Sequence, residues 1–229
     1  MKPATVVQPA ERRANQRGDG GSIPARSLLF AMNMLDEAAS LVRQFHYSKR
    51  PAANVQAVGT WHMPDGLLGL PGTCIAACCF SIPPTRWTEE VIELSRLVRT
   101  PDSAPPLTQL IRLTLARLPQ QFDLAVSFAD KTQGHVGYVY QAAGWKYSGA
   151  RERCMDGVVI EGKFYAGRSC NSTWGTRSPS KLAALLRVAV EPHYDEGKHL
   201  YWKAVRASGA AKAERLGLQS LAYPKGGAK

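Results

Sequence analysis

Apolar residues in the first half of the chain form short strand-like runs and one helical stripe. Four runs predict buried strands: residues 26–35, 55–63, 73–82 and 90–100. Between the first two runs, residues 36–51 predict a helix. Its apolar positions have helical spacing and Pro51 lies just beyond its end.

Helical and strand-like patterns then follow one another. Residues 101–119 predict a helix with one apolar stripe, and residues 122–130 predict a buried strand that leads into a helix at 134–143. The remaining expected elements are strands within 146–165, a helix at 178–190 capped by Ser178, and a strand at 199–205. Strands that first cluster and then alternate with helices predict an α/β fold. We expect a mixed central sheet flanked by helices.

The composition predicts three parts. Residues 1–24 are polar, Gly-rich and basic, which is typical of a disordered segment. Residues 25–205 are expected to form one folded domain, and residues 206–229 a basic tail. The formal net charge of +11 favours a polyanionic partner such as DNA.

Cysteine usage and hydropathy restrict the possible sites and the cellular location. The five cysteines contain no C-x-x-C pair, so we expect reduced thiols and no metal site. The longest apolar stretch is interrupted by Gly and Pro, and no segment has about 18 consecutive apolar residues. We therefore expect a cytoplasmic protein with no membrane partner.

Polar chemistry gathers where the strand at 122–130 meets the next helix, in SFADKTQGHVGYVYQAAGW. Ser127, Asp130 and His135 lie within nine positions of one another. In α/β sheets, sites form at the carboxyl ends of strands. The alternatives are structural: Ser127 as a small core residue, Asp130 as a helix cap, and His135 as a neutral histidine at a helix N-terminus.

Two more polar clusters stand beside apolar elements. HYSKR, residues 46–50, ends the first predicted helix and is either a solvated terminus or a catalytic or phosphate-contacting edge. In the strand at 90–100, simple alternation puts Glu93 and Arg96 on opposite faces. Because unpaired buried charges are costly, these two side chains are expected either to line a cleft or to face charged partners.

Five stretches carry a resemblance to a known family: HYSKR, ELSRLVRT, the long junction motif, KHLYWK and the terminal YPK. The chain resembles the Mom DNA-modification proteins of bacteriophage Mu type from about residue 40 to 205. This resemblance implies a GNAT-like acyltransferase fold. It also implies conversion of adenine in double-stranded DNA to N6-carbamoylmethyl adenine, which protects phage DNA from the restriction enzymes of the bacterial host. The implied active-site residues are His46, Tyr47, Ser48, Glu93, Arg96, Ser127, Asp130, His135 and Tyr140. Which histidine moves the proton is left open.

The expected contacts with DNA are basic and aromatic side chains: Lys49, Arg50, Tyr138, Trp145, Tyr147, Lys198, Lys203 and Arg206. The donor is open. GNAT enzymes hold the acetyl-CoA pyrophosphate in a Gly-containing turn, and the matching segment here, RTPDSAPPLTQL, has no glycine. We expect a glycyl or other acyl donor, for which charged tRNA is a candidate source and acetyl-CoA an alternative. The competing functions are a conventional GNAT N-acetyltransferase and a non-enzymatic DNA-binding protein.

Overall fold

The computed structural model describes residues 23–64, 71–83, 87–88 and 90–225. Nearly all of the predicted disordered segment, residues 1–24, lies outside this range. The chain divides into two compact units: residues 129–136 and 150–199 form the second, and the other described residues form the first. The single domain predicted for 25–205 is thus divided, because residues 150–199 build a small core of their own.

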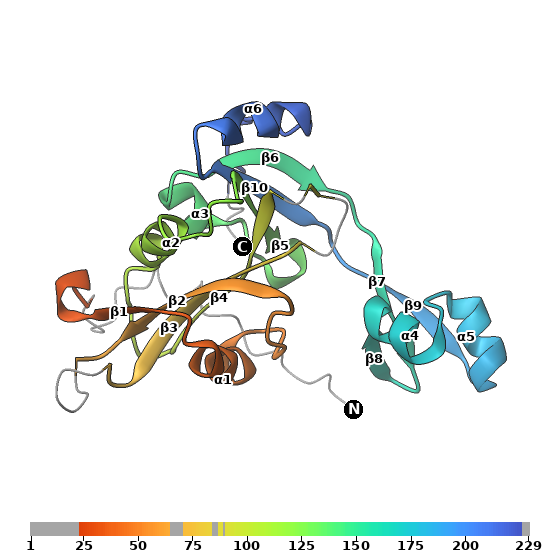
Figure 1. Ribbon diagram of the computed structural model, residues 1–229. Helices are drawn as coiled ribbons and strands as arrows, with labels where there is room; N and C mark the ends of the chain where they lie inside the picture. The colour runs from red at the N-terminus through yellow and green to blue at the C-terminus, as the bar shows by residue number, and fades with distance from the viewer. Residues whose placement is uncertain (1–22, 65–70, 84–86, 89, 226–229) are drawn as a thin grey trace. The chain divides into compact units, whose positions relative to one another are not determined.

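A seven-stranded sheet runs through the fold in the order β1-β2-β3-β4-β5-β10-β6 (Figure 1). Its strands are β1 (Leu29–Met32), β2 (Val55–His62), β3 (Cys74–Ser81), β4 (Val91–Arg99), β5 (Leu124–Asp130), β6 (Lys146–Arg151) and β10 (Lys198–Ala204). The first four strands pair antiparallel, whereas β4 and β5 pair parallel. The predicted mixed α/β sheet is therefore confirmed.

Helices cover both faces of this sheet (Figure 1). They are α1 (Leu35–Phe45), α2 (Leu107–Leu115), α3 (Tyr138–Ala142) and α6 (Ser208–Arg215). Cys79 of β3 packs with Leu41 and Val42 of α1. The Cys78 Sγ atom lies 3.1 Å from Thr114 Oγ1 of α2. Because consecutive strand residues point to opposite faces, α1 and α2 lie on opposite sides of β3.

Close packing of α2 on β2 depends on Gly59. A Cβ atom added at this position would lie 1.8 Å from the Oγ1 atom of Thr114. That hydroxyl also donates to the Leu110 carbonyl at 2.8 Å, so it is held in place by its own helix. The strand needs glycine here because only its backbone can come so close to the helix.

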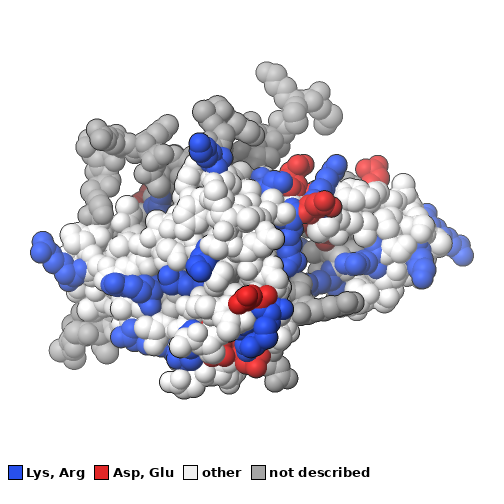
Figure 2. All heavy atoms as spheres, turned by 90° about the horizontal axis from the view of Figure 1, so that it is seen from above, with Lys and Arg blue, Asp and Glu red and all other residues white. Residues whose placement is uncertain are grey.

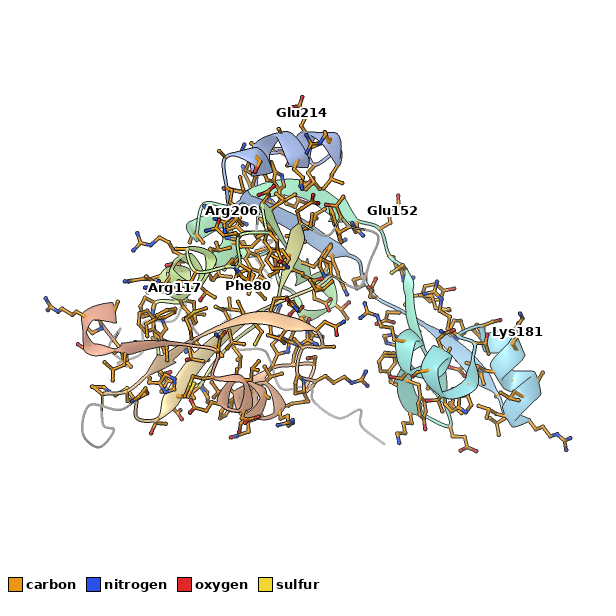
Figure 3. The ribbon with its side chains drawn as sticks, viewed as in Figure 1. Phe80, Arg117, Glu152, Lys181, Arg206 and Glu214 are labelled. Atoms are coloured by element: carbon orange, nitrogen blue, oxygen red, sulfur yellow. The ribbon has the colours of Figure 1, made fainter. Side chains whose placement is uncertain are left out.

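The segment predicted as a basic tail belongs to the core of the first unit. Within it, α6 buries Ala213 against Leu124, Val126 and Trp202. Further along, the Tyr223 hydroxyl donates to a backbone carbonyl at 2.8 Å. This helix has no apolar stripe in the sequence, because its buried residues are Gly209, Lys212 and Ala213. In Figure 3, Glu214 points outward from α6.

The second unit contains a three-stranded antiparallel sheet in the order β8-β7-β9 and two helices. The elements are β7 (Met155–Ile160), β8 (Lys163–Ala166), β9 (Val190–Tyr194), α4 (Gly167–Trp174) and α5 (Pro179–Leu186). Its core consists of Val158, Ile160, Cys170 and Leu182. Ser178 occupies the N-cap position and Pro179 begins α5 as predicted, but the Ser178 side chain makes no capping hydrogen bond. The helix ends at Leu186 because Arg187 has a left-handed backbone. Within the described ranges, no helix combines the length and the apolar character that crossing a bilayer requires.

Candidate active site

A β-bulge at Ser95 brings Glu93 and Arg96 to the same face of β4. Cys79 pairs with Arg96 and the next residue of β3 pairs with Leu94, so Ser95 is the extra residue. The bulge breaks the simple alternation from which opposite faces were predicted. That expectation is corrected: both charged side chains lie on the face that α1 covers, together with Cys79.

Arg96 attaches the HYSKR turn to this face. Its Nε atom donates to the backbone carbonyl of Arg50 at 2.8 Å, and its Nη1 atom donates to the Ser95 carbonyl at 2.6 Å. A guanidinium presents several N–H groups in a fixed plane, so two such bonds restrict its orientation. HYSKR is therefore more than a solvated helix end, because β4 holds its last residue.

Within the turn, a histidine and a serine form a close pair. The Ser48 backbone N–H donates to His46 Nδ1 at 3.2 Å, and the Ser48 Oγ atom lies 2.9 Å from the same nitrogen. Since Nδ1 accepts the backbone N–H, a neutral His46 carries its proton on Nε2. A hydroxyl beside an imidazole lone pair is an arrangement that supports proton transfer. The Tyr47 ring lies 4.4 Å from the imidazole between centroids.

Strands β4 and β5 separate soon after they begin to pair. Their ladder covers Val91–Glu93 and Leu124–Val126, although both strands continue. Ser127 comes next and is fully buried; its hydroxyl donates to the Leu94 carbonyl at 2.8 Å. Because Glu93 pairs with the preceding residue, Ser127 faces the opposite side of the sheet. The structure thus gives Ser127 the geometry of the structural alternative and does not bring it to Glu93 and Arg96.

Asp130 is the last residue of β5 and His135 lies in the loop after this strand, both in the second unit. The Asp130 carboxylate accepts a hydrogen bond from the Thr132 N–H at 3.0 Å and caps the 3-10 helix η4 (Lys131–Gln133). The prediction that His135 lies at the start of a helix is wrong, because α3 begins only at Tyr138. The cause is a left-handed backbone at Gly134 and Gly137. His135 is therefore not at a helix N-terminus, and the structural alternative based on that position does not apply.

His199, which the sequence analysis did not select, is a further titratable residue of the second unit. Burial and the nearby charge of Lys131 lower the pKa of His199 below its ordinary value. The sequence gives little indication of a functional role for His199, since this residue is one of the alternating positions of a strand.

Most of the junction aromatics form a buried cluster. Tyr140 lies 5.6 Å from Trp145 and 5.3 Å from Tyr201, and Tyr147 lies 5.3 Å from Tyr201. Trp145 is fully buried, and Tyr140 and Tyr147 are each less than one tenth exposed. Burial raises the pKa of Tyr147. These rings pack the core and leave no open face for a base, whereas Tyr138 is 55% exposed.

Several cations expected at DNA make hydrogen bonds within the fold. Lys203 Nζ donates to the carbonyls of Ala143 and Gly144 at 3.1 Å each, at the end of α3. Arg206 donates to three carbonyls: those of Leu118, Pro119 and Gln120. In the turn after α1, the Lys49 ammonium donates to the Gln44 carbonyl.

Other basic side chains are more accessible. Arg50 is exposed, and Lys198 is partly exposed with its ammonium 3.9 Å from the Asp195 carboxylate. Figure 2 shows Lys and Arg side chains spread over much of one face of the molecule, with fewer Asp and Glu. The positive charge is thus distributed over the surface, which favours contact with an extended anion.

One group of possible metal ligands lies away from the predicted sites. Glu37, His62 and Cys74 each offer one ligand atom, and these atoms all lie within 4.8 Å of one another. Burial and the Glu37 charge raise the pKa of the Cys74 thiol to about 12. These three residues come from three separate elements and form no local motif, so no metal site was predicted from the sequence.

Comparison with known proteins gives one family and several similar folds. A model described as the Mom protein family matches residues 27–225. A GNAT-family protein from Desulfovibrio desulfuricans is similar in structure, with 13% identity, a TM-score of 0.44, and coverage of 78% of this chain and 99% of that chain. An N-acetyltransferase from Staphylococcus aureus Mu50 has 10% identity, a TM-score of 0.41, and coverage of 78% and 97%. A search of curated proteins gave no match.

Proposed function

Because the chain belongs to the Mom protein family over residues 27–225, we propose that it is an acyltransferase-like enzyme that modifies adenine in double-stranded DNA. The product is N6-carbamoylmethyl adenine, which protects phage DNA from restriction in the cytoplasm of a bacterial host. The observation that carries this proposal is the HYSKR turn, which Arg96 holds on the Glu93 face of β4. Two of the motifs that resemble the family, HYSKR and ELSRLVRT, are therefore in contact on this face of β4.

The charge and the exposed aromatic support DNA as the substrate. A net charge of +11 favours binding to a polyanion, and Arg50 is exposed in the turn. The exocyclic amine of adenine lies within the base stack, so chemistry on it requires the base to be extruded. Tyr138, with 55% exposure, supplies the aromatic surface for that base.

The residues of the turn have defined roles in this proposal. His46 accepts the Ser48 hydroxyl proton at Nδ1, so this pair moves a proton at the reacting centre. Arg96 places the turn and binds a carboxyl or phosphate oxygen of the donor through its remaining N–H groups. For Asp130 and His135, which belong to the second unit, the family resemblance implies roles that variants of each residue test separately.

A glycyl donor accounts for all atoms of the product. The adenine amine N6 attacks the glycyl carbonyl, an N–C bond forms, and the carrier leaves as its alcohol or thiol after the amine loses a proton. The free glycyl amine then attacks ring carbon C6, and the C6–N6 bond breaks. The former N6 becomes the terminal amide nitrogen, and a proton passes to it. No oxidant or second nitrogen donor is needed.

Isotope labelling in modified DNA tests both the function and the donor. The chain is co-expressed with DNA in cells fed either glycine labelled with ¹³C and ¹⁵N or acetate labelled with ¹³C. The nucleosides of the DNA are then analysed by mass spectrometry. We expect carbamoylmethyl adenine with the glycine nitrogen bonded to the ring. Acetate label alone would overturn the glycyl donor while leaving adenine modification intact. Absence of modified adenine in cells that contain the folded protein would overturn the function itself.

A further inference from the structure

Three ligand-type side chains meet between the start of α1 and one end of the β2–β3 pair. His62 is the last residue of β2 and pairs directly with Cys74, the first residue of β3. Paired residues of neighbouring strands project their side chains to the same face. Glu37, in the first turn of α1, lies over this pair: its Oε2 atom is 3.4 Å from His62 Nε2.

The hydrogen bonds of His62 fix which nitrogen faces Glu37 as an acceptor. Its Nδ1 atom lies 3.0 Å from the Gly72 carbonyl, which accepts only, so Nδ1 carries a proton. The Nε2 atom lies 2.9 Å from the Thr60 hydroxyl. That hydroxyl has its own acceptor in the Ala31 carbonyl, at 3.2 Å. A neutral His62 therefore directs a lone pair toward a carboxylate.

A proton or a cation between the His62 Nε2 and Glu37 Oε2 atoms would stabilise this arrangement. His62 is fully buried, and the Glu37 Oε2 atom is buried and accepts no hydrogen bond within the described part of the chain. Two lone pairs at 3.4 Å repel each other unless a proton or a cation lies between them. A proton makes an imidazolium–carboxylate pair; a cation makes a metal site in which Cys74 is also a ligand.

We propose that Glu37, His62 and Cys74 bind a zinc ion, with solvent as the fourth ligand. Thiolate, imidazole and carboxylate together suit zinc, which takes three protein ligands and a water in open sites. Cys74 loses its proton on binding, as zinc-bound thiols do. The Gly72 carbonyl acts as the outer partner that orients the imidazole, a feature common to metal-bound histidines. The Glu37 side chain is 41% exposed as a whole, whereas its Oε2 atom, which faces His62, is buried.

The zinc site is distinct from the proposed modification site. Glu37 lies in the first turn of α1, whereas His46 follows its last turn, about 14 Å further along the helix axis at the usual rise per residue. The ion ties the N-terminal end of α1 to β2 and β3. Its effect is on the stability of the first unit, and it takes no part in the transfer reaction.

Metal analysis of the full-length chain tests this proposal. The protein is stripped with a chelator, titrated with zinc or with cobalt as a spectroscopic probe, and passed through a desalting column. We expect about one equivalent of metal per chain, a thiolate-to-cobalt charge-transfer band, and a higher melting temperature with zinc. Cys74→Ala should remove the band and weaken zinc binding by more than the roughly 10–100-fold typical of losing an outer partner. Glu37→Gln, a change at a partly exposed side chain, should weaken it without unfolding the chain.

Cys154→Ser is the matched control, because Cys154 is an exposed thiol of the second unit. It should leave both the stoichiometry and the band unchanged. Failure of the wild-type chain to retain zinc or cobalt would overturn the proposal and leave His62 and Glu37 as an imidazolium–carboxylate pair. Full retention in Cys74→Ala, or loss in Cys154→Ser, would overturn it as well.

Discussion

The Nε atom of Arg96 donates to the backbone carbonyl of Arg50 at 2.8 Å and so joins the centre of β4 to the turn that follows α1. This bond exists because the bulge at Ser95 turns Arg96 toward α1. The turn contains the His46–Ser48 pair, whose atoms lie 2.9 Å apart. Arg96 therefore sets the position of the His46–Ser48 pair from a strand, which is a more rigid support than a loop.

Loss of this bond should reduce DNA modification more than it reduces stability. Arg96→Ala frees the end of the turn and removes a cation that binds the donor, so we expect modification to fall by about 100-fold, the effect of a misplacement near 1 Å. Arg96→Lys keeps the charge but cannot reproduce the geometry of the guanidinium. Both variants are measured by nucleoside mass spectrometry beside a urea unfolding curve.

Arg43→Ala is the matched control for that experiment, since Arg43 is an exposed residue of the same helix, α1. It removes one positive charge without touching the turn. We expect a loss of at most a few-fold. An equal loss in the Arg43 and Arg96 variants would mean that Arg96 acts only through the overall charge.

The same bulge marks the limit of prediction from the sequence. The hydrophobic pattern was sufficient to place β2, β3, β4 and the mixed sheet, because burial on a sheet face has a fixed period. The faces of Glu93 and Arg96 were wrong because one extra residue in β4 changes that period. Nothing local in ELSRLVRT distinguishes a bulge from a regular strand, since pairing with β3 determines it.

Asp130→Asn separates a chemical role from a capping role. Asparagine keeps an oxygen that accepts from the Thr132 N–H, now 3.0 Å away, but it removes the negative charge. We expect DNA modification to be abolished, DNA affinity to change by only a few-fold, and the unfolding free energy to stay within about 0.5 kcal/mol. Asp130→Ala also loses the cap, which costs about 1 kcal/mol. Wild-type modification by Asp130→Asn would make this residue a cap alone.

Lys203→Met should lower stability without changing the salt dependence of DNA binding. Its ammonium donates to the carbonyls of Ala143 and Gly144, so its removal leaves the end of α3 without two donors. We expect a loss of about 1 kcal/mol in urea unfolding. Lys181→Met is the control, because Lys181 is exposed on α5 and points outward (Figure 3). A slope of log K against log salt that becomes shallower by about 0.9 would instead identify Lys203 as a phosphate contact.

Tyr138 is the junction aromatic that the structure leaves available to a base. Tyr138→Ala should weaken productive DNA binding by about 1–3 kcal/mol, the usual contribution of one stacked base. Tyr138→Phe keeps the ring and should retain most of the affinity. Binding to DNA and modification are both measured. An equal loss in the two variants would assign the effect to the hydroxyl group and contradict stacking.

Burial separates the junction residues that pack the core from those at the surface. SFADKTQGHVGYVYQAAGW contains both core and surface positions, and residue type alone does not separate them. Trp145 and Ser127 are fully buried, and the latter uses its hydroxyl within the sheet. Tyr140 packs against Tyr201, which comes from a distant part of the chain. The polar chemistry of this stretch was recognisable, whereas its distribution between core and surface required the fold.

Acid sensitivity of the first unit should depend on Glu90, whose carboxylate lies 2.8 Å from the buried ammonium of Lys212. The hydrogen bond from Lys212 lowers the pKa of Glu90 from 4.5 to about 2. Since the pKa is lower in the folded state, the stabilisation is complete above pH about 4.5 and is lost as the pH falls toward about 2. Glu90→Gln should remove this part of the pH dependence. Urea unfolding curves across that range should therefore show a smaller decline for the variant than for the wild-type chain.

Glu214→Gln serves as the control for this titration, because Glu214 is an exposed residue of α6 that points away from the fold (Figure 3). It should leave the acid profile unchanged. Lys212 keeps a counter-ion in the Glu90 variant, since the Asp123 carboxylate lies 3.7 Å from its ammonium, so the variant should fold. A decline identical to that of the wild-type chain would show that Asp123 alone satisfies Lys212. The Glu90 contact would then contribute nothing to the stability of α6, and the acid sensitivity of this unit would have to come from other carboxylates.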